Sequence, residues 1–268
     1  MDIISKQAER LDTLVKAFKE DSVQYRDLPT PSDDEGKRRL LRSLMNIRMP
    51  GRLPVDVIRI QDAYLRARAT EKGIVVLDDI PVIKSSLSLW QGDITRLAMD
   101  AIVNAANSQM LGCFVPMHTC IDNCIHTFAG VQLRLACAEQ MTKLRAQYGE
   151  DYEQPTAVPM LTDGYNLPAR KVIHIVGPIV EDQLTVEHER KLADCYANTL
   201  NMCLENGLKS VAFCCISTGV FMFPNQRAAE IAVGAVETWL REHPGQMERV
   251  IFNVFKNDDR LIYERLLT

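Results

Sequence analysis

From residue 74 to the C-terminus, short apolar runs rich in β-branched and aromatic residues alternate with longer stretches of helical periodicity. This alternation is typical of a sheet that is covered by helices on both faces, which makes an α/β fold the expected class. The predicted strands span residues 87–91, 101–104, 157–161, 172–176, 210–215 and 249–255. The predicted helices span residues 122–147, 186–206, 225–241 and 258–267. Ligands bind such sheets at the loops that follow strands, so these loops are where we expect functional residues.

The first 73 residues have a different pattern, which predicts only helices and loops. Two apolar stripes at helical spacing support this, formed by Leu11, Leu14, Val15 and Phe18 and by Leu40, Leu41, Leu44 and Met45. Ser32 and Glu35 have the spacing of a capping box for the second helix, and Gly73 is suited to end the third. We expect a helical extension over residues 1–73 that packs on a main domain over residues 74–268 and completes its core.

Five arginines in this extension allow two interpretations. They are Arg38, Arg39, Arg42, Arg66 and Arg68. Charge on a helix is usually solvated surface, which is the first interpretation. The alternative is that these side chains contribute to docking an acidic protein substrate.

The overall composition excludes several classes of function. A formal net charge of -4 and a pI near 5.8 provide no basic surface for nucleic acid. The sequence has no secretion signal at its N-terminus and no apolar run long enough to span a bilayer. Eight cysteines are scattered without a pairing pattern, which argues against a disulfide framework. We expect a protein of the reducing cytoplasm.

Cys113, His118 and Cys120 form the most reactive cluster in the chain. Two thiols and an imidazole within eight residues can converge on one soft cation such as zinc. Three protein ligands leave one position of tetrahedral zinc open, as in catalytic sites. Cysteine is also a common buried residue, so the three could instead be packing residues. Cys124 and His126 are competing ligands, but they fall within a predicted helix, where we expect packing or supporting roles.

Two loops after predicted strands are candidates for ligand binding. The segment Ile-Ser-Thr-Gly-Val-Phe-Met-Phe-Pro over residues 216–224 leads into a helix, whose N-terminus offers backbone donors to phosphate oxygens. Gly219 would permit close approach, although an ordinary turn has the same composition. In the second loop, Asp93 could accept hydrogen bonds from an amino-bearing base, or it could cap the short helix that follows.

Three loops match one family in the same order. Residues 92–95 read Gly-Asp-Ile-Thr, residues 102–108 read Ile-Val-Asn-Ala-Ala-Asn-Ser, and residues 216–221 read Ile-Ser-Thr-Gly-Val-Phe. With the C-terminal run over residues 250–255, they resemble the macrodomain, an ADP-ribose-binding fold, from about residue 87 onward. The resemblance implies a three-layer α/β/α architecture with a mixed central sheet.

The segment over residues 113–120 departs from the common macrodomain pattern, because it replaces a glycine-rich loop. Ile-Asp at 121–122 and Ile-His at 125–126 still match. This combination resembles the zinc-dependent bacterial macrodomains, which also carry an N-terminal helical extension. A second departure is Met222, which stands where a glycine is common and puts the shape of the 216–224 loop in doubt.

The resemblance also implies roles for individual residues. Asp93 and Ile94 would lie at the adenine end of ADP-ribose. Asn107 and Asp122 would lie beside the distal ribose as the catalytic residues, with Phe221 packed against that sugar. The metal ligands would be Cys113, His118 and Cys120, with one Zn²⁺ at the scissile bond. The diphosphate would be bound by Ser217, Thr218, Gly219, Val220 and Phe221.

The function implied is a zinc-dependent hydrolase that removes mono-ADP-ribose from proteins and releases ADP-ribose. An ester to Asp or Glu is the expected linkage. The expected partner is a lipoyl-carrier protein that a sirtuin-like transferase has modified. Two alternatives are an ADP-ribose-binding module with a structural zinc and a hydrolase of small ADP-ribose derivatives. Zinc could acidify a water or orient a ribose hydroxyl, and Asp122 could accept a proton or only cap its helix.

Overall fold

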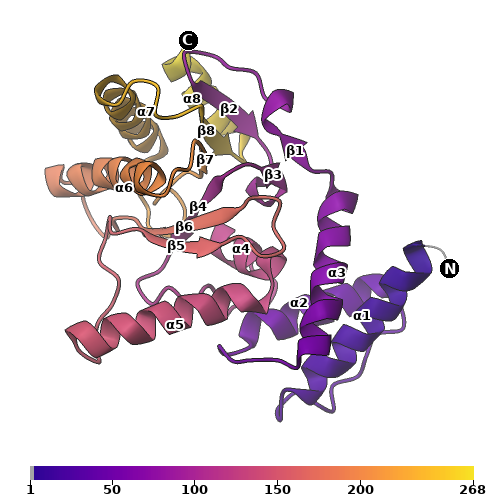
Figure 1. Ribbon diagram of the computed structural model, residues 1–268. Helices are drawn as coiled ribbons and strands as arrows, with labels where there is room; N and C mark the ends of the chain where they lie inside the picture. Colours follow the sequence, from indigo (N-terminus) through magenta and orange to yellow (C-terminus); the bar gives the residue numbers. More distant parts are fainter. Residues whose placement is uncertain (1–2) are drawn as a thin grey trace.

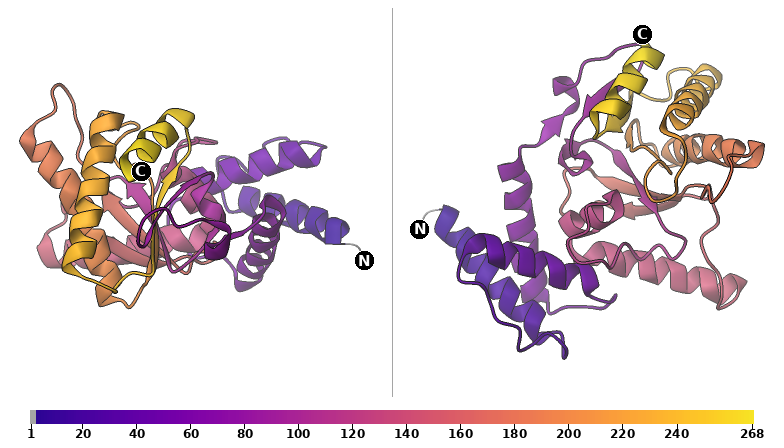
Figure 2. Two further views of the ribbon diagram at one scale, coloured as in Figure 1. Left: turned by 90° about the horizontal axis from the view of Figure 1, so that it is seen from above. Right: turned by 180° about the vertical axis from the view of Figure 1, so that it is seen from behind.

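The computed structural model describes residues 3–268, which contain a six-stranded sheet with helices on both sides (Figures 1 and 2). The strand order is β2-β8-β7-β4-β6-β5. Only β5 runs antiparallel to its neighbour, so the predicted mixed sheet is confirmed. The strands are β2 Leu87–Gln91, β4 Ala101–Ala106, β5 Met160–Asp163, β6 Lys171–Val176, β7 Ser210–Phe213 and β8 Arg249–Val254.

The helices form two layers, one on each face of the sheet. From β2 to β5 the chain progresses toward the β5 edge, and from β6 to β8 it returns toward the β2 edge, so the connecting helices of the two halves lie on opposite faces. In one layer, α6 (Val186–Glu205) packs on α7 (Asn225–Glu242), which packs on α8 (Asn257–Leu267). In the other layer, α4 (Ile121–Ala129) packs on β4, and α5 (Val131–Tyr148) packs on β5. With both faces covered, the central strands β4 and β7 consist almost wholly of buried residues.

Three local predictions need correction. The helix predicted over residues 122–147 is two helices, because Gly130 has a φ of +96° and ends α4. The strand predicted over residues 157–161 lies at β5, three residues later. A small parallel pair, β1 (Val75–Val76) and β3 (Leu97–Ala98), was too short to predict, and so were the 3₁₀ helices η1 (Leu77–Asp79) and η2 (Ile94–Arg96).

The N-terminal helices are α1 (Ile3–Glu20), α2 (Asp34–Ile47) and α3 (Val55–Lys72). Their apolar stripes pack on one another and form a cluster separate from the core around the sheet. The expectation that they complete the core of the main domain is therefore wrong, although α2 and α3 both contact α4. The predicted capping box is also wrong by one residue, because Asp33 rather than Ser32 accepts a hydrogen bond from the Gly36 backbone N–H.

Among the helices of residues 3–268, none has the length and apolar character that crossing a bilayer requires.

Candidate active site

The segment over residues 111–120, which we call the metal loop, connects the end of β4 to α4 and brings its three candidate ligands together. One donor atom each from Cys113, His118 and Cys120 lies within 4.8 Å of the other two. The Cys113 Sγ to His118 Nδ1 distance is 3.6 Å. Tetrahedral zinc with ordinary bond lengths separates such a sulfur and nitrogen by about 3.5 Å. The donor set therefore fits a zinc ion without rearrangement of this pair.

Without a cation, the surroundings of Cys120 favour its neutral thiol. Burial, and then the neighbouring Cys113 and Asp122, raises the pKa of Cys120 to about 12. Two adjacent thiolates are therefore unfavourable unless a positive ion lies between them. Among the described residues, the group contains neither Cys124 nor His126. Cys124 instead lies near Arg42 and the Thr119 carbonyl, so the three donors leave one position of a tetrahedral ion open.

Side chains of α2 and α4 hold the metal loop from outside. Arg42 donates to the His118 carbonyl oxygen at 2.7 Å, and Asn46 accepts from the Met117 backbone N–H at 3.0 Å. Asn123 donates to the Cys113 and Val115 carbonyl oxygens at 3.3 and 2.9 Å. Arg42 also donates to Asn123 at 3.0 Å. Because two of these anchors are on α2, the N-terminal helices help to position the candidate ligands.

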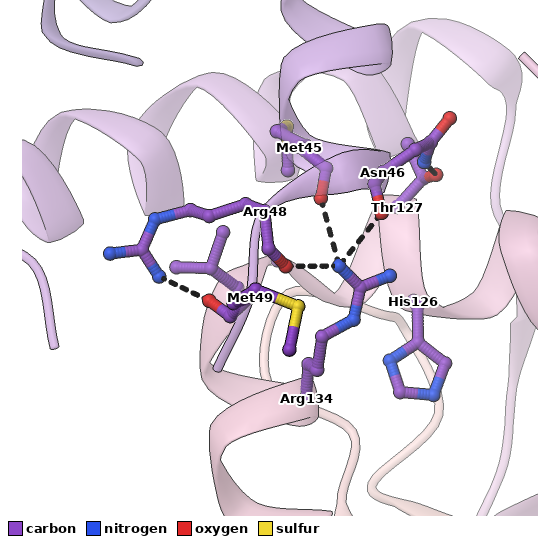
Figure 3. A pocket seen from close by; sticks show the side chains of 9 residues that line it. Met45, Asn46, Arg48, Met49, His126, Thr127 and Arg134 are labelled. Carbon is purple, nitrogen blue, oxygen red and sulfur yellow. Dashed lines mark hydrogen bonds between the residues drawn. The ribbon is translucent and has the colours of Figure 1, made fainter. Parts of the chain in front are cut away.

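Arg134 of α5 ties the same loop to the end of α2, and Figure 3 shows its bonds to α2. Its Nη1 donates to the carbonyl oxygens of Met45, Asn46 and Arg48 at 3.2, 2.9 and 2.6 Å. Its Nε donates to the Leu111 carbonyl oxygen at 2.7 Å, at the start of the metal loop. A helix C-terminus leaves carbonyl groups without partners, and a buried guanidinium satisfies several of them together. Arg134 thus joins three segments that are distant in sequence.

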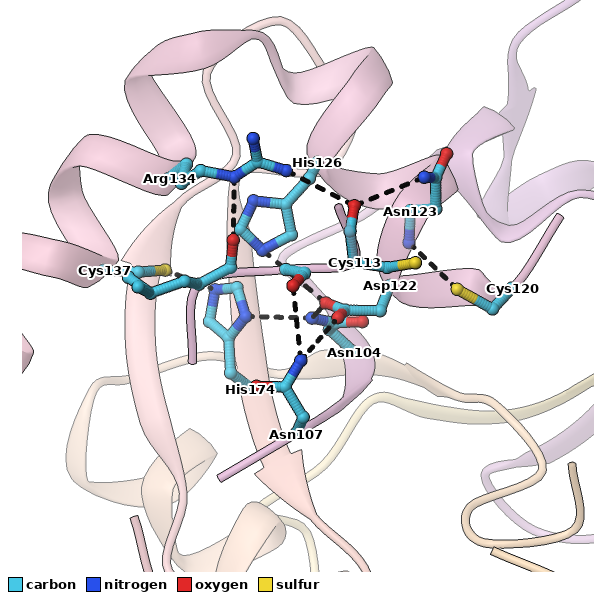
Figure 4. Close-up of polar contacts among 12 residues, drawn as sticks. Asn104, Asn107, Cys113, Cys120, Asp122, Asn123, His126, Arg134, Cys137 and His174 are labelled. Atoms are coloured by element: carbon cyan, nitrogen blue, oxygen red, sulfur yellow. Dashed lines mark hydrogen bonds and ion pairs between the residues drawn. The ribbon is translucent and has the colours of Figure 1, made fainter. Parts of the chain in front are cut away.

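Asp122 lies below the metal loop with two asparagines of the Asn-Ala-Ala-Asn segment (Figure 4). Asn104 donates to its Oδ1 at 2.7 Å, and the Asn107 side-chain nitrogen lies 3.5 Å from its Oδ2. Burial raises the pKa of Asp122 to about 6, although the Asn104 hydrogen bond opposes this change. Asp122 is not the helix cap, because Cys120 occupies that position. The two predicted catalytic residues are therefore adjacent.

His174 of β6 completes a buried chain of hydrogen bonds behind Asp122. Its Nδ1 lies 3.1 Å from the Asn104 side-chain nitrogen, and its Nε2 lies 2.9 Å from Thr162 Oγ1. Burial lowers the pKa of His174 to about 3, so the ring is neutral at physiological pH. Asn104 already uses its amide hydrogens, so Nδ1 accepts and Nε2–H donates. This chain fixes the orientation of Asn104 and hence of its bond to Asp122.

A second set of soft donors, His126, Cys137 and His174, is fully buried and also lies within 4.8 Å. Both His174 nitrogens already have partners. Burial also raises the pKa of the Cys137 thiol far above its usual value. A metal here would have to displace these hydrogen bonds and ionise a buried thiol. The metal loop is therefore the better metal site, and His126 belongs to the packed interior, as the sequence indicated.

At the predicted adenine end, Asp93 has protein partners. Its carboxylate accepts from the Thr95 backbone N–H at 3.0 Å and lies 3.1 Å from Lys72 Nζ. Burial by itself would raise the pKa of Asp93, but the Thr95 hydrogen bonds and the Lys72 charge outweigh burial and lower it. Asp93 thus caps η2, the simpler of its two predicted roles, and neighbouring Ile94 is buried.

The loop over residues 216–224, which we call the diphosphate loop, is held mainly by its own backbone. The Phe223 backbone N–H donates to the Ser217 carbonyl oxygen at 3.0 Å, and the Phe221 carbonyl oxygen accepts from the Val180 N–H at 2.9 Å. Ser217 has a φ of +65°, and its buried hydroxyl has no partner among the described residues. Val220 is exposed, whereas Phe221 packs against the core.

Thr218 and Gly219 complete the predicted diphosphate-binding set. The Thr218 hydroxyl donates to the Cys215 carbonyl oxygen at 3.0 Å. No heavy atom lies within 4 Å of where a Cβ on Gly219 would stand, so a ligand can approach the backbone there closely. Met222 has a φ of +58°, a left-handed conformation that glycine adopts more easily, so the backbone at this position is one that suits the glycine common in the family.

Known proteins match this chain over almost its full length. A sequence model described as Macro domain matches residues 103–232. A Treponema medium protein named Protein-ADP-ribose hydrolase is 45% identical over 98% of this chain and 99% of its own length. A Staphylococcus aureus protein of the same name is 40% identical over 100% of this chain and 98% of its own. The chain belongs to the macro domain family.

Solved macro domains share the fold. The Trypanosoma brucei macrodomain in complex with ADP-ribose has a TM-score of 0.65 at 29% identity, over 85% of this chain and 95% of that one. An Oceanobacillus iheyensis macrodomain mutant with ADPR has a TM-score of 0.62 at 34% identity, over 70% of this chain and 95% of that one. The predicted macro domain fold is confirmed. The Oceanobacillus iheyensis structure covers only 70% of this chain, so part of this macro domain has no counterpart in that comparison.

Proposed function

We propose that this macro domain hydrolyses the bond between ADP-ribose and a modified protein, with zinc held by Cys113, His118 and Cys120. The observation that carries the proposal is the convergence of these three donors at the start of α4, whose first turn contains Asp122. The names of the full-length relatives support the same reaction. Bound zinc would supply a Lewis acid for a water or a ribose hydroxyl.

The protein's own side chains account for proton movement and orientation. Cleavage at the anomeric carbon develops positive charge on the sugar, and a nearby carboxylate stabilises that charge. With its pKa near 6, Asp122 is mostly ionised at neutral pH and can accept a proton from an attacking water. Asn104 holds one carboxylate oxygen, and Asn107, which now donates to the Gly112 carbonyl oxygen at 3.2 Å, would exchange that bond to orient the distal ribose. The two asparagines would thus have separate roles.

We further propose that Asp93, Ile94 and residues 217–221 bind the adenine and diphosphate parts of ADP-ribose. A buried Ser217 hydroxyl without a protein partner supports this, because a phosphate oxygen could accept its hydrogen bond. Adenine recognition by Asp93 would require the carboxylate to exchange Lys72 for a base amino group. The substrate would be a cytoplasmic carrier protein, such as the lipoyl carrier, modified on Asp or Glu by a sirtuin-like transferase. We also propose that the boundary between the N-terminal extension and the catalytic domain lies near residue 73.

The deciding experiment is release of ADP-ribose from a carboxylate-modified protein by untreated, chelator-stripped and zinc-restored protein. Loss and recovery of activity would support zinc-dependent hydrolysis. Activity that persists after verified metal removal would reduce the three ligands to structural residues. If no sample released ADP-ribose but the protein still bound free ADP-ribose, the result would favour a binding module.

A further inference from the structure

A cavity of about 160 Å³ lies between α2, α3 and α4, beside the metal loop. Its base is apolar, with buried Leu41, Met45, Tyr64 and Leu65 beside Phe128. Five cationic side chains line the same cavity, which we call the basic pocket: Arg38, Arg39, Arg42, Arg68 and Lys72. In a protein whose net charge is -4, this is a local concentration of positive charge.

The carboxylates nearby do not balance these five cations. In residues 3–268, three carboxylates are within ion-pair distance of these cations. Glu35 lies 3.9 Å from Arg38, Asp93 lies 3.1 Å from Lys72, and Glu71 pairs with Arg68. Arg39 and Arg42 have no carboxylate partner in the same part of the chain. A net positive pocket remains, which favours an anionic ligand.

Two guanidinium groups that line the pocket also have a nitrogen without an acceptor. The Nε atoms of Arg38 and Arg42 are buried, and neither has a hydrogen-bond partner in the described part of the chain. A buried N–H group without an acceptor is unfavourable, so these two guanidinium groups are not fully satisfied by the protein itself. Guanidinium groups bind carboxylates with paired, charge-assisted hydrogen bonds. The apolar base would contact the methylene groups of the same side chain.

The position of the pocket indicates a role in binding a protein substrate rather than in binding ADP-ribose. Two of its three walls, α2 and α3, lie outside residues 103–232, which the family model matches. The pocket adjoins the metal loop, because Met117 lines it and Arg42 donates to the His118 carbonyl oxygen. A group bound here would lie near the proposed scissile bond, on the side of the N-terminal helices.

We propose that the basic pocket binds a glutamate or aspartate side chain of the ADP-ribosylated protein, near its modified residue. This inference rests on the proposed function for the identity of the partner. Four of the five arginines that the sequence suggested for acidic docking line the pocket. The fifth, Arg66, instead donates to Asn166 at 3.2 Å.

A binding experiment tests the pocket without turnover. Fluorescence anisotropy of a labelled hexaglutamate peptide would be measured at low and high salt with wild type, Arg39→Glu, Arg68→Glu and the double variant. We expect wild-type binding that weakens with salt, and a loss of about tenfold or more in the double variant. Arg59→Glu is the matched control, because Arg59 is on α3, 77% exposed and outside the pocket. Equal binding by wild type and the double variant would overturn the proposal, as would displacement of the peptide by equimolar inorganic phosphate.

Kinetics then separate this inference from the proposed function. With a modified acidic protein, the double variant should show a KM raised about tenfold and an unchanged kcat. With a small ADP-ribosyl ester, both constants should match wild type. An equal loss on both substrates would instead place these arginines in the catalytic site and overturn the docking role. No hydrolysis of either substrate by wild type would refute the proposed function alone, because peptide binding is measured independently.

Discussion

The metal loop and the diphosphate loop both follow central strands of one sheet, but they are stabilised in different ways. Side chains from three helices hold the metal loop, including Arg42 and Asn46 of α2 and Arg134 of α5. The diphosphate loop is held by backbone hydrogen bonds, most of them between its own residues and one from Val180, and Val220 is exposed. Metal ligands must keep a fixed geometry, whereas phosphate binding needs backbone groups that are free to donate. The N-terminal helices therefore contact the metal loop through α2, whereas at the predicted adenine end they contribute Lys72 of α3, which lies 3.1 Å from Asp93.

The largest effect is expected from Asp122→Asn, which removes the proposed proton acceptor beside the metal loop. The asparagine retains the shape of the side chain, so folding and zinc content should persist while turnover falls by about 10²–10⁴-fold. Single-turnover release of ADP-ribose measures this directly. Wild-type turnover in this variant would remove Asp122 from the mechanism. ADP-ribose affinity, which the diphosphate loop should provide, serves as the control.

Arg134→Ala should lower the free energy of unfolding by about 3 kcal/mol, because five carbonyl groups lose a buried donor. Urea denaturation measures the loss. The matched control is Arg145→Ala on the same helix, where one carbonyl and one side-chain acceptor are lost in a more exposed place. Equal losses in the two variants would mean that Arg134 is not a special link between α2 and the metal loop.

Stability should depend on His174 as pH falls. Its pKa is about 3 in the folded protein and near 6.5 when unfolded, so its contribution is present above pH 6.5 and lost toward pH 3. This amounts to about 2 kcal/mol between pH 7 and pH 5. Asp122 acts oppositely, because its pKa is raised to about 6 and its protonation stabilises the fold over the same interval.

The measurement that isolates His174 is therefore the difference in unfolding free energy between wild type and His174→Gln at pH 7 and pH 5. We expect this difference to shrink at pH 5 as wild type loses the histidine contribution. A constant difference would mean that His174 is not held neutral.

Asn46→Ala should have a smaller effect, about 1 kcal/mol, because it breaks the link between α2 and the Met117 backbone. Zinc affinity should fall while ADP-ribose affinity is retained. Thr218→Ala in the diphosphate loop should have the smallest effect, about 0.5 kcal/mol on stability, since its hydroxyl only donates to the Cys215 carbonyl oxygen. Zinc titration of both variants tests whether the two loops are stabilised differently. The difference is refuted if Thr218→Ala lowers the zinc affinity as much as Asn46→Ala does.

Much of the fold was predictable because periodicity reports which residues face a core. Strand β2 and the start of α6 were predicted at their observed residues. The break at Gly130 was not, because the apolar spacing continues across it. What ends α4 is a positive φ in crowded surroundings, where a Cβ would lie 2.7 Å from Gln61 and 3.0 Å from Asn166. Those neighbours are distant in sequence, so no local pattern indicated them.

The candidate site shows the same limit. The Asn-Ala-Ala-Asn motif contains Asn104, yet only the contacts with Asp122 and His174 reveal what Asn104 does. Arg42 and Asn46 belong to no motif, and nothing in the sequence relates them to a loop some seventy residues away. Roles of this kind depend on packing between elements, which cannot be predicted from the pattern of a single sequence.

The α/β class, the family and the three soft donors of the metal loop can all be read from the amino-acid sequence, because they depend on periodicity and on residues close together in the chain. That the N-terminal helices hold this loop, and that their arginines line a pocket beside it, became visible only in the folded protein. Hydrogen bonds and cavities form between surfaces, and the pairing of surfaces is settled by burial over the whole molecule.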